Sequence, residues 1–216
     1  MNRILSVCVI LGHLFLMPLY AEISSFTEAI GVYFPLTYQK NPNKVHWSQS
    51  GYTGSGDRHS LTAVGLGLRY FPIENFFLDY SQKKLISQQK IGDIVDSNYL
   101  YNADIESMDT YSFTLNYFIF RNAKNLGIYI GGGRNINSVI FLPFGRNASG
   151  SSIATHFYTM TLRTGIEYKF SKRGVISLTI GYESPFSFSH IDYANRLFKY
   201  DYKSGVYFEP ALILYF

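Results

Sequence analysis

The residues best suited to catalysis in this chain are four histidines that follow residue 21: His46, His59, His156 and His190. A histidine that lies close to a serine and to an acid or amide can activate the serine as a nucleophile. Two groupings offer this chemistry, His59 beside Ser60 and the segment from Ser189 to Asp192. The first grouping has no third partner in the sequence. In the second, an extended chain would point Ser189 and His190 to opposite faces. The sequence therefore predicts no catalytic residues.

A second set of chemically notable residues is charged and lies in segments that otherwise alternate apolar and small polar residues. Its members are Arg69, Asp79, Arg163, Glu167, Lys169, Glu183 and Glu209. Counting outward from the intervening turns brings Arg69 near Asp79, and Arg163 near Glu183. Charges on the inner face of a narrow barrel must pair or meet water, because an isolated buried charge is very costly. We interpret the set as a structural polar network. The alternative is a polar conduit for small solutes, opened when ion pairs exchange partners.

The charged residues lie on segments with the period-two alternation of β-strands. Eight such segments cover residues 29–38, 61–71, 76–81, 109–120, 126–133, 158–170, 176–183 and 206–216. In each segment one face carries aliphatic and aromatic residues, and the other carries mostly glycine, serine, threonine and the charged residues. A barrel with a lipid-facing wall has this pattern, whereas a soluble barrel places its apolar residues inside. We therefore predict an all-β fold, an eight-stranded antiparallel up-and-down transmembrane β-barrel.

The connections between these segments alternate strictly between short and long. The short ones cover residues 72–75, 121–125 and 171–174, and the long ones cover residues 39–60, 82–108, 134–155 and 184–204. Outer-membrane barrels have short periplasmic turns and long external loops. The alternation therefore predicts four long loops on the external side.

The N-terminus has the features of a secretory signal that is cleaved after Ala21. A positive residue, Arg3, precedes an apolar stretch from Ile4 to Leu16, which is too short to anchor the chain in a membrane. Cleavage would remove Cys8, the only cysteine, and leave residues 22–216 as one domain. We expect no metal and no cofactor, because the histidines lack carboxylates at the spacing of a metal site. The net charge of +4 is scattered, so no nucleic-acid partner is expected.

The chain ends on a strand whose last residue is aromatic. One face of this strand carries Phe208, Leu212, Leu214 and Phe216. A soluble protein would expose such a strand as a sticky edge, whereas closure of a barrel in a bilayer removes the edges. The pattern resembles the C-terminal signal that the assembly machinery for bacterial outer-membrane barrels reads. We therefore predict that these four residues form an assembly signal.

Two prolines depart from the strand pattern. Pro35 and Pro210 fall within the first and last predicted strands, where each removes a donor from the hydrogen-bond ladder. Because these strands should pair to close the barrel, we expect both prolines near that seam or at bulges.

The chain after the signal resembles the small eight-stranded outer-membrane barrels, the class of the OmpA transmembrane domain, OmpX, OmpW and the opacity proteins. The likeness rests on the signal, the alternation, the glycine-rich segment from Tyr129 to Arg134 and the terminal Phe216. It implies a multi-pass protein of the bacterial outer membrane that contacts the lipid bilayer and lipopolysaccharide. Members of the class act as adhesins, evasion factors, envelope stabilisers or small conduits, and a few barrels of this size modify lipid A.

The resemblance leads us to expect a surface-exposed structural or adhesion-type role, exercised through the external loops, rather than an enzyme. The alternatives are a conduit for small solutes or hydrophobic compounds, and a lipid A-modifying enzyme. We expect a monomer or weak oligomer without a cofactor.

The predicted loops contain the candidate contacts to a host or extracellular ligand. Trp47, the only tryptophan, and Phe144 lie in segments rich in glycine, serine and asparagine, and aromatic residues are enriched at binding hot spots. Other loop tyrosines have the period-two spacing of strands that continue above the membrane: Tyr99, Tyr101, Tyr200 and Tyr202. We expect these four to belong to the outer aromatic girdle.

Overall fold

The structure is a computed structural model that describes residues 30–40, 43–49, 52–91, 94–96, 99–101, 104–121, 125–142, 152–191, 197–202 and 205–216. The predicted signal segment and Phe144 lie outside these residues. Every regular element within them is a β-strand. Among the described residues, no helix is long and apolar enough to cross a membrane.

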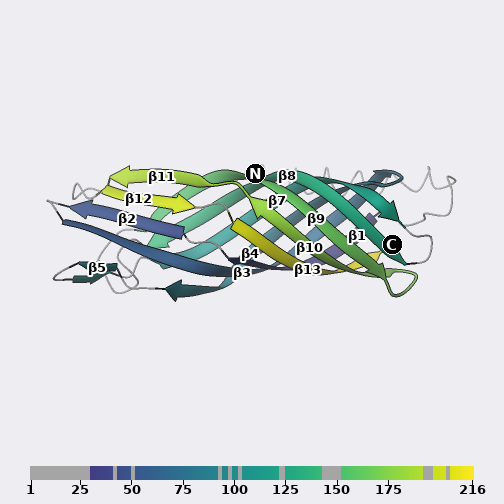
Figure 1. Ribbon diagram of the computed structural model, residues 1–216, viewed down its shortest axis with the longest axis horizontal. Coiled ribbons are helices and arrows are strands. Elements are labelled where there is room, and N and C mark those ends of the chain that lie inside the picture. The colour runs from purple at the N-terminus through teal and green to yellow at the C-terminus, as the bar shows by residue number, and fades with distance from the viewer. Residues whose placement is uncertain are drawn as a thin grey trace, which may run out of the picture.

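Eight strands form a closed antiparallel barrel (Figure 1). They are β1 (Ile30–Lys40), β3 (Tyr52–Ile73), β4 (Phe76–Ile91), β7 (Asp104–Arg121), β8 (Leu126–Leu142), β9 (Ile153–Lys169), β10 (Gly174–Glu183) and β13 (Gly205–Tyr215). Their order is β1-β13-β10-β9-β8-β7-β4-β3, and pairing of β1 with β3 closes the ring. The predicted eight-stranded barrel is confirmed.

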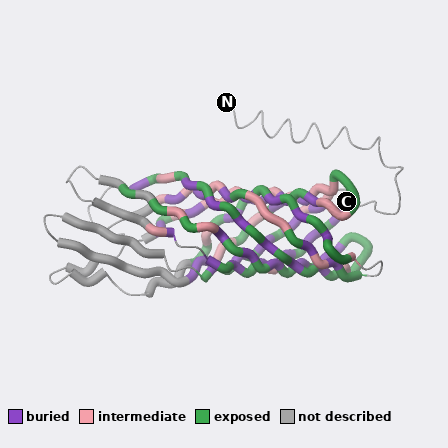
Figure 2. The backbone as a smooth tube through the Cα atoms, turned by 45° about the horizontal axis from the view of Figure 1, so that its top comes forward, coloured by how far each residue is buried: buried purple, intermediate pink, exposed green. Residues whose placement is uncertain are grey.

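Buried and exposed residues alternate along most of the barrel strands, as the colours along the backbone in Figure 2 show. On β9, Met160 and Leu162 are 61% and 68% exposed, whereas their neighbours Thr161 and Arg163 are 3% and 8% exposed. The same alternation continues on β10 and β13. Apolar side chains thus face outward and polar ones inward, the reverse of a soluble protein.

One end of the barrel is closed by tight turns. Glu74 and Asn75 join β3 to β4, and Asn75 adopts a left-handed backbone conformation with φ of 68°, which asparagine tolerates better than most residues. At the turn between β9 and β10, the Ser171 hydroxyl accepts a hydrogen bond of 2.7 Å from the Gly174 N–H. Side-chain oxygens of serine commonly stabilise such turns.

The other end of the barrel contains further strands in segments that the sequence predicted as loops. It contains β2 (Asn43–Gln49), β5 (Ile94–Asp96), β6 (Tyr99–Tyr101), β11 (Phe186–Ile191) and β12 (Leu197–Tyr202). β2 pairs with β3, β12 with β2, and β11 with β12, so these strands continue the wall. The prediction that residues 39–60, 82–108, 134–155 and 184–204 are loops was wrong for the parts that these five strands and the extended ends of β3, β4, β7, β8 and β9 occupy. Strands outside the membrane need no continuous apolar face, so the alternation that revealed the barrel strands is weak in them.

The wall has a discontinuity where β10 leads into β11. The Ser184 N–H donates to the Met160 carbonyl at 2.9 Å, and Pro185 follows, which has no N–H to donate. Within the described residues, no ladder joins β11 to β9 beyond this point. Instead the Phe186 ring stacks on the Phe157 ring, with 4.6 Å between the centroids.

The first and last strands of the barrel, β1 and β13, pair with each other. Both unusual prolines lie on these two strands. Pro35 is opposite Ala211, and its side chain points inward. Pro210 lies on the other face of β13 and is opposite Leu178 of β10. The predicted location of both prolines near the seam is confirmed.

Several interior glycines make room for a tyrosine ring on the neighbouring strand. The directly opposed pairs are Gly31 with Tyr215, Gly67 with Tyr33, Gly165 with Tyr129, and Gly181 with Tyr207. A Cβ atom on Gly181 would lie 2.1 Å from Cζ of Tyr207. That ring cannot easily move away, because its hydroxyl is hydrogen-bonded to Thr161 Oγ1 at 3.0 Å.

Gly181→Ala should therefore destabilise the barrel. We expect the free energy of unfolding to fall by about 1–3 kcal/mol, the usual cost of overpacking an interior. Gly132→Ala is the matched control, because its new Cβ would meet nothing closer than the Thr161 carbonyl at 3.1 Å. Urea unfolding in detergent micelles, followed by circular dichroism, measures both. Equal losses for the two variants would contradict this account of the glycine.

Candidate functional site

The centre of the lumen is a network of ionised side chains around Arg69. This guanidinium donates to both oxygens of Asp79, with Nε–Oδ1 at 2.7 Å and Nη2–Oδ2 at 2.9 Å. Its Nη1 also donates to Glu167. Arg163 approaches from β9, donating to Asp79 and, at 2.8 Å, to Oδ1 of Asn116. Two cations and two anions thus neutralise one another away from water.

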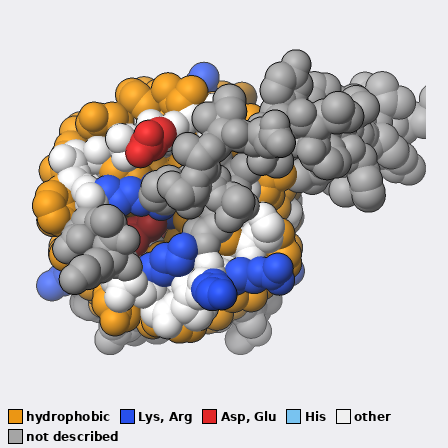
Figure 3. Space-filling model, turned by 90° about the vertical axis from the view of Figure 1, so that its right-hand side faces the viewer, with side chains coloured by type: hydrophobic (Ala, Val, Ile, Leu, Met, Phe, Trp, Pro, Cys, Tyr) orange, Lys and Arg blue, Asp and Glu red, His pale blue; other side chains and the backbone are white. Residues whose placement is uncertain are grey.

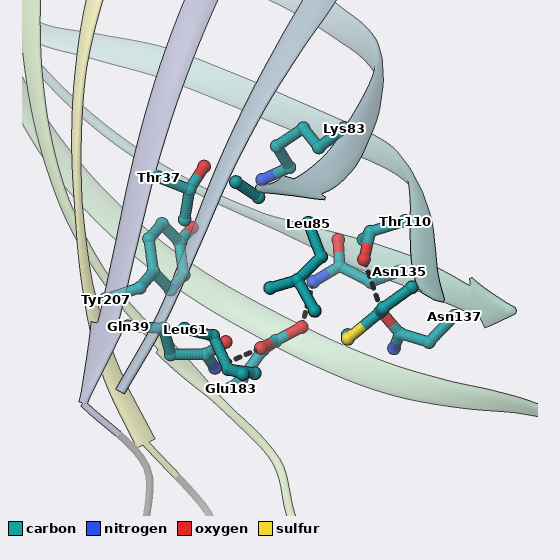
Figure 4. Close-up of a pocket in the computed structure, with 12 residues that line it drawn as sticks. Thr37, Gln39, Leu61, Lys83, Leu85, Thr110, Asn135, Asn137, Glu183 and Tyr207 are labelled. Carbon is teal, nitrogen blue, oxygen red and sulfur yellow. Dashed lines mark hydrogen bonds between the residues drawn. The ribbon is translucent and has the colours of Figure 1, made fainter. Parts of the chain in front are cut away.

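Two further carboxylates lie on the external side of this network. Glu209 accepts hydrogen bonds from Lys83 at 2.8 Å and from the Thr37 hydroxyl at 2.5 Å. Glu183 is surrounded by neutral donors: Gln39, Asn135, Thr159 and Tyr202. Figure 4 shows Gln39 and Asn135 reaching this carboxylate from opposite sides. Hydrogen bonds from neutral groups can stabilise a buried carboxylate without a cation.

The structure brings together most, though not all, of the charged residues that the sequence singled out. Arg69 lies directly opposite Asp79, as expected. Arg163 does not contact Glu183, because it is opposite Gly181 and reaches across the lumen to Asp79. Lys169 is only half-buried, at the turn end of β9.

Lys83 is the charged residue that the sequence analysis missed. The predicted third strand was followed only to residue 81, whereas β4 continues to Ile91. Asp79, Ser81 and Lys83 share the inner face. Extending the alternation by two residues would have found it.

Apolar layers cover the polar network at both ends. At the turn end, rings of Phe71, Phe77, Phe118 and Tyr129 pack together, and Arg69 lies 4.0 Å above the Phe77 ring. At the external end lies an apolar cap, defined as Leu61, Ile105, Met108, Val139, Ile153, Phe157 and Tyr202. Among the described residues, the protein's own side chains therefore fill most of the lumen.

A small cavity separates the polar network from the apolar cap. Its volume is about 40 Å³, and Lys83, Glu183 and Asn135 are among its polar lining residues (Figure 4). A volume of this size holds one or two water molecules. The cavity is therefore large enough for water beside the network and too small for a larger ligand.

Of the four tyrosines predicted to belong to the outer girdle, Tyr99 and Tyr101 lie on β6, and Tyr200 and Tyr202 lie on β12. Strands β6 and β12 contain all four, so the prediction of strand structure is confirmed. The prediction that Tyr202 belongs to the outer girdle was wrong. Its side chain is buried in the apolar cap and donates to Glu183 at 2.6 Å.

The other predicted site residues lie in three places. The terminal set, Phe208, Leu212, Leu214 and Phe216, is exposed on the wall. Trp47 lies on β2, where its backbone pairs with Gly54 of β3 and Phe198 of β12. Its side chain lies outside the described residues. Of the candidate catalytic residues, His156 is exposed on β9 and Ser60 is buried. The side chains of His59 and His190 lie outside the described residues. In the described part of the chain, no three metal-ligating groups cluster.

Two belts of exposed aromatic residues mark the limits of the apolar wall. Tyr117, Tyr168, Phe170 and Phe216 lie toward the turn end, and Tyr38, Tyr158 and Tyr182 toward the external end. On β9 the belts are ten residues apart, from Tyr158 to Tyr168, which matches a strand that crosses a bilayer at a tilt. Viewed from the turn end, hydrophobic side chains form much of the outline of the barrel (Figure 3).

The chain has the fold of a transmembrane β-barrel. A closed wall, an apolar belt between aromatic girdles, and a polar lumen are the features of that class. Solved structures with a similar fold include Neisserial surface protein A, with 13% identity, 86% of this chain and 97% of that chain covered, and a TM-score of 0.49. The N-terminal barrel domain of Pseudomonas aeruginosa OprF is 11% identical to this chain, with a TM-score of 0.45. The match covers 83% of this chain and 96% of the OprF domain.

The attachment invasion locus protein Ail of Yersinia pestis is 15% identical to this chain, with a TM-score of 0.42. The match covers 84% of this chain and 99% of Ail. No protein-family model matches this chain, and no curated protein matches it.

Asp79→Ala should be strongly destabilising, because it leaves Arg69 and Arg163 buried without their shared anion. We expect a loss of about 3–5 kcal/mol, the cost of breaking a buried ion pair by removing one partner. Asp109→Ala removes the same charge from a half-buried position outside the network and should cost about 0.5 kcal/mol or less. Urea unfolding in micelles measures both, and equal losses would show that the network is not the stabilising element.

Because the lumen is filled, the folded protein should be electrically silent in planar lipid bilayers. Arg163→Ala should remain silent, since the aromatic layer and the apolar cap still close both ends. Steady conductance steps in the wild type that change in Arg163→Ala would instead support the conduit role.

Proposed function

We propose that the protein is a surface-exposed binding protein of the adhesion type, acting through the part of its wall that rises above the membrane. The observation that supports this is strand length. β3 has 22 residues, and β7, β8 and β9 have 18, 17 and 17. A strand needs about 9–11 residues to cross the bilayer. The remainder builds a structured external platform.

The platform also contains strands that take no part in the membrane barrel. β2, β12 and β11 add to the edge of β3 in that order. They lie together at the left-hand end in Figure 1, opposite the turns. Residues on strands are held more precisely than residues on loops, which favours a specific contact surface. Trp47 lies on the strand that connects β3 to β12.

The filled lumen favours this role over the alternatives. A solute would have to displace both the apolar cap and the ion-pair network to cross, so the external surface is the part best placed to meet partners. The proposal also includes no catalytic step. Lipid A from cells that produce the protein should keep its mass, and a change abolished by His190→Ala would point to the enzyme instead.

Binding by the platform can be tested with a non-adherent bacterial strain that produces the protein in its outer membrane. The probes are immobilised laminin, fibronectin and heparin. We expect the wild type to bind at least one probe, and Trp47→Ala or Phe144→Ala to lower the bound fraction about tenfold, because aromatic anchors contribute most at interfaces.

Ser187→Ala is the control, because it changes an exposed β11 position that carries no aromatic anchor. A heat-dependent mobility shift on a denaturing gel checks that each variant folds. If all variants fold, and the two aromatic substitutions bind like the wild type, those residues are not the contacts. Absence of binding to any probe by the folded wild type would refute a matrix-adhesion role.

A further inference from the structure

An arginine lies on the outward face of the wall, away from the polar lumen. Arg134 lies on the outward face of β8 and is exposed. Its direct neighbours in the ladders are Phe113 on β7 and Met160 on β9, both exposed and apolar. Within the described residues, no carboxylate forms a salt bridge with it. Among the described residues, this guanidinium on an apolar wall therefore has no acidic partner.

The position of Arg134 along the barrel axis is set by an aromatic contact. Its Cζ lies 4.1 Å from the centre of the Tyr158 ring. Tyr158 belongs to the external aromatic girdle, so the guanidinium is at the external interface and not at the bilayer centre. The cost of an arginine on the lipid face is lowest at this depth. The cation–π contact also orients the planar group.

A second exposed cation on the same wall shows the contrast. Lys84 of β4 lies directly opposite Asp109 of β7 and so has an acidic neighbour in the ladder. Arg134 has no acidic residue directly opposite it on either side. An anion at the level of the lipid headgroups would complement its charge.

We propose that Arg134, oriented by Tyr158, binds a phosphate group of lipid A in the outer leaflet. The guanidinium presents paired donors in a fixed plane, which matches two oxygens of a phosphate better than an ammonium does. A phosphate at the girdle level would be the anion that the wall lacks. This inference rests on the outer-membrane location and is independent of the proposed adhesion role.

Native mass spectrometry of the folded protein in non-ionic detergent, titrated with diphosphoryl lipid A, tests the inference. We expect the wild type to retain one lipid A molecule and Arg134→Gln to lower its apparent affinity about tenfold. Tyr158→Phe keeps the ring and should bind like the wild type, whereas Tyr158→Ala should weaken binding because the guanidinium loses its orientation.

Lys172→Gln is the matched control, since it removes one exposed cation from a turn at the opposite end of the barrel. It should bind like the wild type. Dephosphorylated lipid A should bind weakly to every variant. The inference is wrong if Arg134→Gln binds as tightly as the wild type, if Lys172→Gln loses as much, or if removal of the phosphates has no effect. The gel shift reports folding, the lipid A titration tests this inference, and the adhesion assay tests the proposed function. Failure of one proposal can therefore be told from failure of the other.

Discussion

The whole barrel depends on neutralising charge inside a tube that is too narrow to hold bulk water. Eight strands enclose just enough space for their own side chains. An unpaired ion there would cost several kcal/mol. Asp79 meets this constraint by accepting from two guanidinium groups, Arg69 on the neighbouring strand and Arg163 across the lumen. The contact between Arg163 and Asp79 joins β9 to β4 across the lumen, two strands that are distant in sequence.

The remaining layers follow from the same constraint. Rings at the turn end and the apolar cap at the external end keep water from reaching the ion pairs in quantity. Large tyrosine rings cross the lumen because glycines opposite them supply the space. The outer wall is free of these demands and follows the chemistry of the bilayer, with aliphatic residues between aromatic belts. The exposed cations Lys40, Lys84 and Arg134 depart from this division.

Sequence reasoning was most successful where the bilayer imposes a rule on each residue. The alternation in residues 158–170 and 206–216 predicted the correct inward and outward faces, because every outward position must suit lipid. It also placed Arg69 beside Asp79, since a tight turn fixes the register of a hairpin. Contacts across the lumen were beyond it: Arg163 reaches Asp79 because of the curvature of the closed wall, which no local pattern encodes. Above the membrane the rule disappears, so β2, β11 and β12 were taken for loops, and Tyr202 was placed on the wrong side.

The interruption at Pro185 gives the two halves of the molecule different evolutionary freedom. Inside the membrane the hydrogen-bond ring has no free edge, so a change of register in one strand would disturb every other strand. Above Ser184 the described part of β11 is joined to β9 by ring stacking and not by a ladder. Insertions or deletions between β10 and β13 can therefore accumulate there without shifting the pairing below. The external surface can diversify under selection while the transmembrane ring stays constant.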